Sequence, residues 1–175
     1  MLRINLLRLT VDLKLSLVTS YILPLIDYCN IACLAATNSF MYKLQKLLNS
    51  AVRFIFNLTG ERRKLSITPY LKKLHILPVE YRIKYKVCLL VYKCFHDKAP
   101  AYLKNLIRPR ISYAHLRSDA DFYTLETIVP NTTYGESSFS YIAPVEWNSL
   151  PQDVRLCPSL ETFKKHLKSY YFSKF

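Results

Sequence analysis

The segment from Pro78 to about His96 constrains the fold more than any other part of the chain. Its apolar side chains recur at helical spacing and form one stripe: Val79, Ile83, Val87, Leu90, Val91, Cys94 and Phe95. Proline fits the first turn of a helix, where its missing amide hydrogen costs nothing. The other faces carry Tyr81, Tyr85 and Tyr92. Because a helix that is apolar on most sides is usually central in a bundle, the sequence predicts a mainly α fold built around this segment.

Two long helices are expected before it. The first covers Val11–Ala35, with an apolar face at four-residue spacing (Leu13, Leu17, Tyr21, Leu25) and a kink or an end at Pro24. The second begins at a cap on Asn38 or Ser39 and ends near Thr59, where Gly60 supplies the stop.

Shorter elements are expected on either side of the central helix and after it. Short helices are predicted over Ser66–Leu74, capped by Ser66 or Thr68, and over Pro100–Ile107. The segment Phe122–Val129 is predicted as a strand and Asn131–Gly135 as a turn, which gives a small β element near residues 122–135. Phe139–Leu150 contains Trp147, is interrupted by Pro144 and is closed by Pro151. Ser159 is predicted to cap a last helix that reaches about Phe172.

The 175 residues can bury roughly 70% of their unfolded surface, enough for a real core. The formal net charge is +13, and it is concentrated in residues 41–110, which carry 16 basic and 3 acidic residues. Residues 111–158 carry 2 basic and 6 acidic residues. This change in the balance of basic and acidic residues predicts a basic helical part over residues 1–110 and a C-terminal subdomain over residues 111–175. An excess of positive charge attracts polyanions, above all nucleic acid.

The five cysteines are odd in number and irregular in spacing, which disfavours a disulfide framework and favours a reducing, intracellular compartment in the cytoplasm or the nucleus. The apolar run from Leu15 to Ile26 is too short to span a membrane. No membrane partner is therefore predicted.

The residue spacings that metal-dependent and nucleophilic enzymes require are not found in the sequence. Asp119 and Asp121 are the only close acidic pair outside a predicted helix, and they lack the apolar strand–turn–strand frame of a polymerase metal site. Cys29 and Cys33 supply only two possible zinc ligands, so a buried cysteine pair is the expected arrangement. The sequence has no nucleophile elbow, phosphate loop or dinucleotide fingerprint. It therefore predicts no catalytic residue, no metal, no cofactor and no small-molecule substrate.

Basic residues interleaved with tyrosines are the remaining candidates for function. Lysine and arginine neutralise phosphates, and tyrosine rings can stack on unpaired bases near Tyr70, Tyr81 and Tyr85. The candidate nucleic-acid contacts are Arg62, Arg63, Lys64, Lys72, Lys73, Arg82, Lys84 and Lys86. The alternative is that these lysines form solvated helix faces and that the tyrosines belong to the core.

Several short motifs of the sequence, here called words, resemble the region after the catalytic domain of jockey-like non-LTR (LINE-type) retrotransposon reverse transcriptases. The resemblance covers about Leu13 to Phe172, and the motifs occur in the same order. The words are Ile22–Cys29, Lys43–Arg53, Leu74–Lys86, Ala99–Leu103, Arg117-Ser118, Ser138–Pro151 and Phe163–Lys168. The most specific is Ala143-Pro144 followed after two residues by Trp147-Asn148-Ser149-Leu150-Pro151. Leu48, Ser50 and Ile76 depart from the family, which has glutamine, arginine and tryptophan there.

The resemblance implies that the first helices belong to or adjoin the thumb, that the palm aspartates and the endonuclease lie upstream, and that the upstream polymerase domain is a partner. It transfers no catalytic residue. Pro24, Tyr28, Pro78, Pro144, Trp147 and Pro151 are expected to act as structural anchors. Two alternatives stay open: a structural or assembly domain without nucleic-acid binding, and a domesticated stand-alone module that binds RNA or single-stranded DNA.

Overall fold

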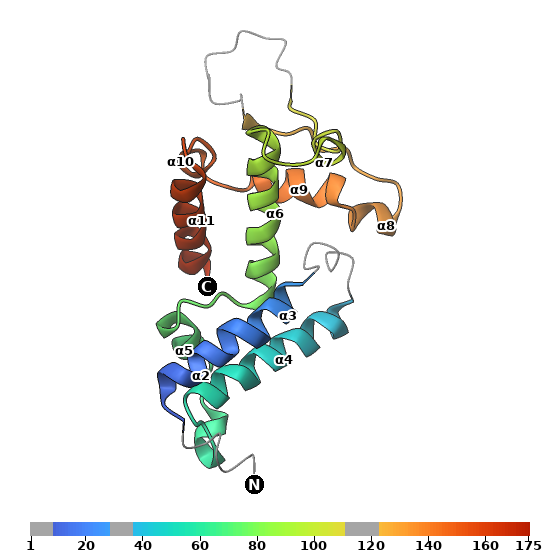
Figure 1. The fold of residues 1–175 in the computed structure, drawn as a ribbon. Helices are drawn as coiled ribbons and strands as arrows, with labels where there is room; N and C mark the ends of the chain where they lie inside the picture. The colour runs from blue at the N-terminus through green and yellow to red at the C-terminus, as the bar shows by residue number, and fades with distance from the viewer. Residues whose placement is uncertain (1–8, 29–36, 111–122) are drawn as a thin grey trace. The chain divides into compact units, whose positions relative to one another are not determined.

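The computed structural model describes residues 9–28, 37–110 and 123–175, and it is mainly helical (Figure 1). The expected mainly α fold class is confirmed. The predicted cysteine pair, Asp119 and Asp121, and the Arg117-Ser118 word lie outside the described residues.

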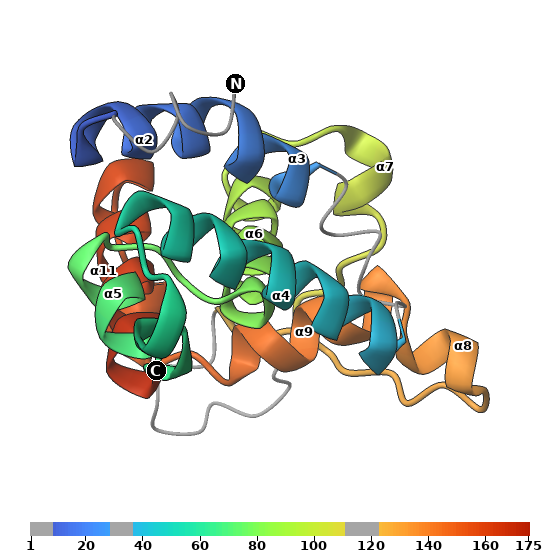
Figure 2. The same cartoon turned by 90° about the horizontal axis from the view of Figure 1, so that it is seen from below.

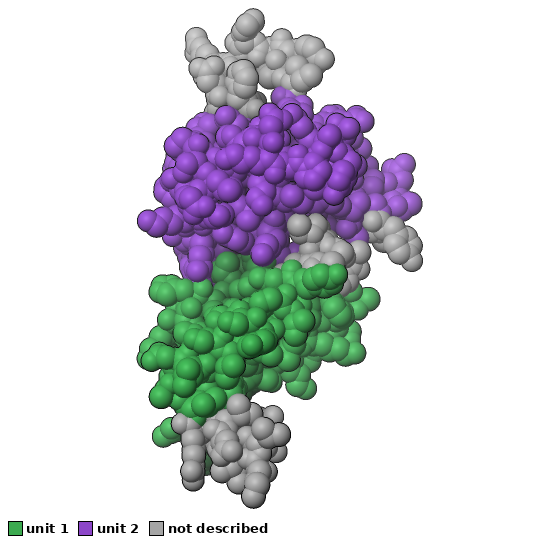
Figure 3. All heavy atoms as spheres, viewed as in Figure 1, with its two compact units in different colours: residues 1–30, 36–82 green, residues 31–35, 83–175 purple. Residues whose placement is uncertain are grey.

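The chain divides into two compact units (Figure 3). Unit 1 comprises Met1–Asn30 and Ala36–Arg82, and unit 2 comprises Ile31–Ala35 and Ile83–Phe175. The division falls inside α6 (Val79–Phe95), not at the residue 110 boundary expected from the charge texture. The reason is that the later turns of α6 bury Val87, Val91 and Tyr92 in the core of unit 2.

The first helical segment of unit 1 changes its helix type before Pro24. It consists of α2 (Val11–Leu17), a π-helical turn (Val18–Ile22) and α3 (Leu23–Asp27). Pro24 cannot donate the hydrogen bond of a regular turn, and its ring crowds the preceding turn, so a wider π turn accommodates it. The helix therefore continues past Pro24 to Asp27. The remainder of the predicted helix, beyond Tyr28, lies outside the described part.

The second long helix, α4 (Asn38–Ile55), lies alongside α2 and α3 in both views (Figures 1 and 2). Its cap is Thr37, whose hydroxyl accepts from the Phe40 amide, so the predicted cap on Asn38 or Ser39 is wrong by one or two residues. Its end also differs from the prediction. Asn57 adopts a left-handed conformation (φ 53°), and the Leu58 amide donates to the Arg53 carbonyl, which closes the helix before Gly60 is reached.

The connection to α6 contains a 3-10 turn (Gly60–Lys64) and α5 (Thr68–Lys73). Neither Ser66 nor Thr68 caps α5. The residue before the helix is Ile67, without a side-chain cap, and Pro69 occupies the first turn. The C-terminal ends of α5 and α6 repeat the closure of α4, with His75 (φ 53°) and Asp97 (φ 54°) in the left-handed region. Three helix ends thus use non-glycine residues where glycine is preferred.

Aromatic packing forms the core of unit 2. Tyr92 of α6 stacks on Phe163 of α11 (Leu160–Lys174) with centroids 4.3 Å apart. Trp147 of α9 (Phe139–Asn148) is fully buried and lies 5.3 Å from the Phe95 ring and 5.8 Å from the Phe163 ring. The predicted cap on Ser159 is confirmed, because its hydroxyl accepts from the Thr162 amide. Pro144 lies inside α9 without interrupting it; it is buried, as are Ala143 and Trp147.

The expected strand over Phe122–Val129 is wrong for the part that the structure describes. Residues 123–129 form one isolated antiparallel bridge, Pro109 with Leu125. On the other side of Leu125, a side chain of α9 takes the backbone hydrogen bonds that a neighbouring strand would take. The predicted turn at Asn131–Gly135 contains the start of a short helix, α8 (Thr133–Glu136). Unit 2 also contains two further short helices, α7 (Ala101–Lys104) and α10 (Gln152–Arg155).

Candidate nucleic-acid interface

Four of the predicted contact residues are exposed in the connection between α4 and α6. Arg62 and Lys64 lie in the 3-10 turn Gly60–Lys64, and Lys72 and Lys73 lie in the last turn of α5. Arg63 belongs to the same 3-10 turn, but its side chain is outside the described part of the structure. Between Phe56 and Lys73 the chain carries five basic residues and one acidic residue. This connection, here called the basic connection (residues 56–73), is therefore a local concentration of positive charge.

A ring contact folds the basic connection back on itself. The Phe56 ring at the end of α4 lies 4.9 Å from the Tyr70 ring of α5, centroid to centroid. The ammonium group of Lys73 lies 5.7 Å from the centre of the Phe56 ring, within the range of a cation–π contact. The two rings thus join the ends of the segment that contains the basic residues. Tyr70 is half-buried, so part of its surface packs within unit 1 and part of it stays exposed.

Arg82 is engaged within the protein. Its Nε donates to Asp27 Oδ1 at 2.8 Å and its Nη2 to Asp27 Oδ2 at 2.5 Å. The two side chains are only 16% and 20% exposed. A bidentate pair of this kind joins α3 to the start of α6 and uses the donors that a phosphate would need. The sequence pattern gave no sign of it, because 55 residues separate the partners.

Lys84 and Lys86 belong to unit 2. The Lys84 ammonium lies 3.3 Å from the Glu146 carboxylate of α9, and both lysines are half-buried. Glu146 lies within the Ala-Pro-x-x-Trp-Asn word, so Lys84 lies beside a carboxylate of that word. Of the eight predicted residues, the four exposed ones in the basic connection remain the best candidates for phosphate contact.

Lys14 is a charged residue of unit 1 whose role the sequence did not reveal. It is completely buried, its ammonium donates to the Asn57 side-chain oxygen, and it lies 5.4 Å from the centre of the Phe54 ring. Both partners belong to the C-terminal end of α4, where the helix dipole favours a positive charge. Lys14 therefore connects α2 to the turn from which the basic connection starts.

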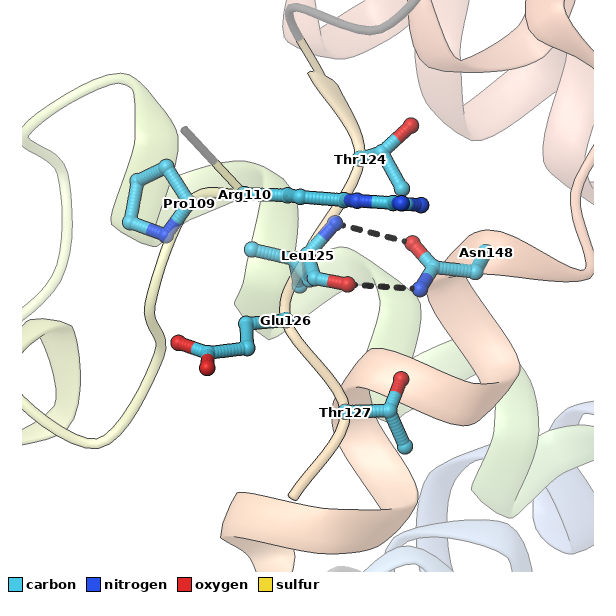
Figure 4. Close-up of a pocket in the computed structure, with 7 residues that line it drawn as sticks. All are labelled: Pro109, Arg110, Thr124, Leu125, Glu126, Thr127 and Asn148. Atoms are coloured by element: carbon cyan, nitrogen blue, oxygen red, sulfur yellow. Dashed lines mark hydrogen bonds between the residues drawn. The ribbon is translucent and has the colours of Figure 1, made fainter. Parts of the chain in front are cut away.

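Trp147 and Asn148 connect the segment around Tyr123 and Leu125 to α9 in unit 2. The Trp147 indole donates to the Tyr123 carbonyl at 2.6 Å. The side-chain oxygen of Asn148 accepts from the backbone amide of Leu125 at 3.0 Å, and the side-chain nitrogen of Asn148 donates to the Leu125 carbonyl at 2.8 Å (Figure 4). A pocket of about 520 Å³ lies beside these bonds, lined by Pro109, Arg110, Thr124, Leu125, Glu126, Thr127 and Asn148. The most specific word of the sequence thus has a direct structural role.

The other expected anchors divide into two groups. Pro144 is buried, and Pro78 and Pro151 precede the first residues of α6 and α10. Pro24 is exposed and acts through the helix backbone. Tyr28 is 78% exposed, so its side chain does not anchor the described part of the fold by burial.

Cys88, Cys94 and Cys157 are free and buried. Burial raises the pKa of the Cys88 thiol to about 12, although a hydrogen bond with the Tyr171 hydroxyl, at 3.4 Å, acts in the opposite direction. Burial also raises the pKa of the Cys94 and Cys157 thiols and of the Tyr171 hydroxyl. These thiols stay protonated near neutral pH, which is unsuited to nucleophilic chemistry.

Within residues 9–28, 37–110 and 123–175, no group of three or more His, Cys, Asp or Glu side chains could hold a metal ion. In the same part of the chain, no helix is long and apolar enough to cross a membrane.

Comparison with known proteins adds no relative. No protein-family model matches the chain, and no curated protein and no solved structure matches it.

Proposed function

We propose that this chain is a catalytically incomplete C-terminal piece of a non-LTR retrotransposon reverse transcriptase, and that its basic connection binds RNA or single-stranded DNA without sequence preference. The proposal of origin rests on the order of the resembling words between Leu13 and Phe172. The proposal implies that the polymerase and endonuclease chemistry belongs to upstream domains, that the chain has no enzymatic activity of its own, and that it acts inside the cell. The free thiols of Cys88, Cys94 and Cys157 fit a reducing compartment.

One observation carries the binding proposal: Arg62, Lys64, Lys72 and Lys73 are exposed in a single connection that the Phe56–Tyr70 ring contact folds back on itself. Phosphate contacts need exposed cations within a short stretch of backbone, and they do not need a base-reading groove. The half-buried tyrosine beside them offers a ring on which a base can stack.

The test is a titration of fluorescent single-stranded RNA with the full chain at two salt concentrations. If about four phosphates are neutralised, the logarithm of the affinity falls with the logarithm of the salt concentration at a slope of about −3. The double variant K72A/K73A should reduce the slope to about −1.5, and the triple variant R62A/R63A/K64A should flatten it as well. Both should weaken binding to all RNA sequences alike, because phosphate contacts carry no base information.

The matched control is K165A/K168A, which removes two exposed lysines from α11 in unit 2. It lowers the net charge of the chain as much as K72A/K73A does. If both double variants change the slope equally, the whole charge of the chain and not the basic connection is responsible. Binding that is absent or independent of salt in the unchanged chain would leave the basic connection as a solvated surface.

A further inference from the structure

The face of α2 and α3 that points away from the core of unit 1 is apolar and exposed. It carries five side chains at three- or four-residue spacing, here called the α2–α3 stripe: Leu13, Leu17, Tyr21, Leu25 and Tyr28. Their exposed fractions range from 37% for Leu17 to 78% for Tyr28. The opposite face buries Lys14, Val18 and Ile26. Since the sequence predicts an apolar face here, the unexpected finding is that the described protein leaves it uncovered.

The π turn straightens this stripe. In a regular α-helix each four-residue step advances about 40° around the axis, so three steps from Leu13 to Leu25 would spread the side chains over about 120°. The turn over Val18–Ile22 takes in an additional residue and counteracts that drift across the step from Leu17 to Tyr21. The five side chains therefore lie closer to one line along the helix, as an extended flat contact requires.

The helices that carry the stripe also contain few charged residues. The net charge is +13, yet the described residues 9–28 contain only Asp12, Lys14 and Asp27 as charged side chains. Lys14 is buried, and Asp27 is paired with Arg82. Asp12 is thus the one exposed charge among residues 9–28 that is not held in that pair, and it is acidic. Two copies of so basic a protein repel each other less through this face than through any lysine-rich one.

We propose that the α2–α3 stripe is a dimer interface in which a second copy of this chain packs in the antiparallel direction about a two-fold axis beside Tyr21. The spacing is self-complementary, because the axis places Leu17 opposite Leu25 of the partner subunit, Leu13 opposite Tyr28 of the partner subunit, and Tyr21 against its own copy. Such an isologous contact closes at two subunits. This inference does not depend on nucleic-acid binding by the basic connection.

The size of the stripe indicates a reversible dimer and not a permanent one. Its exposed side chains present an area on the order of 500–600 Å², somewhat below the ~800 Å² per partner of a standard stable interface. The dimer is therefore expected to dissociate in the micromolar range.

The first experiment is sedimentation of the full chain from about 1 to 200 µM, with the single variants Y21K and Y102K. Tyr21 and Tyr102 are equally exposed, at 67% and 68%, so neither replacement disturbs the core. Tyr102 lies on α7 in unit 2 and is not part of the stripe. Y21K brings two positive charges together at the axis and should raise the dissociation constant at least tenfold, and Y102K should leave it within twofold of the unchanged chain.

The second experiment tests the geometry. Y21C and Y102C are made in a background in which Cys29 and Cys33 are replaced by serine, and each is oxidised with diamide, which accepts the two hydrogens released as a disulfide forms. The Y21C chain should give a dimer crosslinked through residue 21, and the Y102C chain should not. A chain that stays monomeric throughout, an equal effect of Y21K and Y102K, or open-ended oligomers would each overturn the proposal. Monomers that bind neutral lipid vesicles through Tyr21 would replace the second copy with a lipid surface.

Discussion

The bonds of Asn148 to Leu125 allow a quantitative test of what the Ala-Pro-x-x-Trp-Asn word does. The variant N148A removes both hydrogen bonds at once, and Leu125 is buried, so its amide and carbonyl lose their side-chain partner inside the protein. A hydrogen bond contributes about 0.5–1.5 kcal/mol net, and an unsatisfied buried group costs about 1–3 kcal/mol. Because water can reach part of this site from the adjoining pocket, we expect N148A to lower the free energy of unfolding by about 2–4 kcal/mol.

The assay is urea denaturation followed by tryptophan fluorescence. Trp147 is the only tryptophan in the chain, and its indole is bonded to Tyr123 in the same segment, so its emission reports the region that the variant disturbs. At a slope of about 2 kcal/mol per molar urea, the midpoint should fall by about 1–2 M. Far-UV circular dichroism, recorded in parallel, shows whether unit 2 unfolds as a whole or the segment is released first.

The control is N105A, which changes an exposed asparagine just after α7 and should alter stability by less than about 0.5 kcal/mol. The variant N148D adds a test of direction. Its carboxyl group keeps an acceptor for the Leu125 amide, but it faces the Leu125 carbonyl with a second oxygen that cannot donate while the group is ionised. A protonated carboxyl can donate, so the loss in free energy of unfolding relative to the unchanged chain should be smaller at acid pH. If N148A unfolds with the midpoint of N105A, the two bonds contribute nothing to stability and our account of this word is refuted.

Three further predictions concern stability. D27A leaves the half-buried Arg82 guanidinium without its carboxylate partner and should lower the free energy of unfolding by about 2 kcal/mol. K104A breaks the exposed pair with Asp97 and should lower it by less than about 0.5 kcal/mol. Equal losses of stability in thermal unfolding would contradict the argument from burial. H75G should stabilise unit 1 by about 0.5–1 kcal/mol, because glycine adopts the left-handed conformation of residue 75 without strain, and a lower melting temperature would argue against this. Because burial raises the folded pKa of Cys88 from its ordinary 9.0 to about 12, the unfolded chain releases its proton first, so stability should fall between pH 9 and 12 and C88A should flatten that fall.

Local chemistry was enough to predict several parts of the protein from the sequence. The extent of α6 and the cap of α11 on Ser159 follow from helical periodicity and cap residues, which act over a few neighbouring residues. The mainly helical class followed for the same reason. The basic connection could also be predicted, since its charges are adjacent in the sequence.

Only the tertiary structure decided which of the predicted side chains are exposed. Arg82 faces Asp27 across 55 residues, and no local pattern reports such a distant partner. The segment around Leu125 has the composition of a strand, but the Asn148 amide takes the place of a neighbouring strand. The apolar face from Leu13 to Tyr28 was predicted from the sequence, but its exposure was not. Periodicity identifies an apolar face, but whether that face is buried or left exposed depends on what the rest of the chain packs against, and that is a property of the folded protein alone.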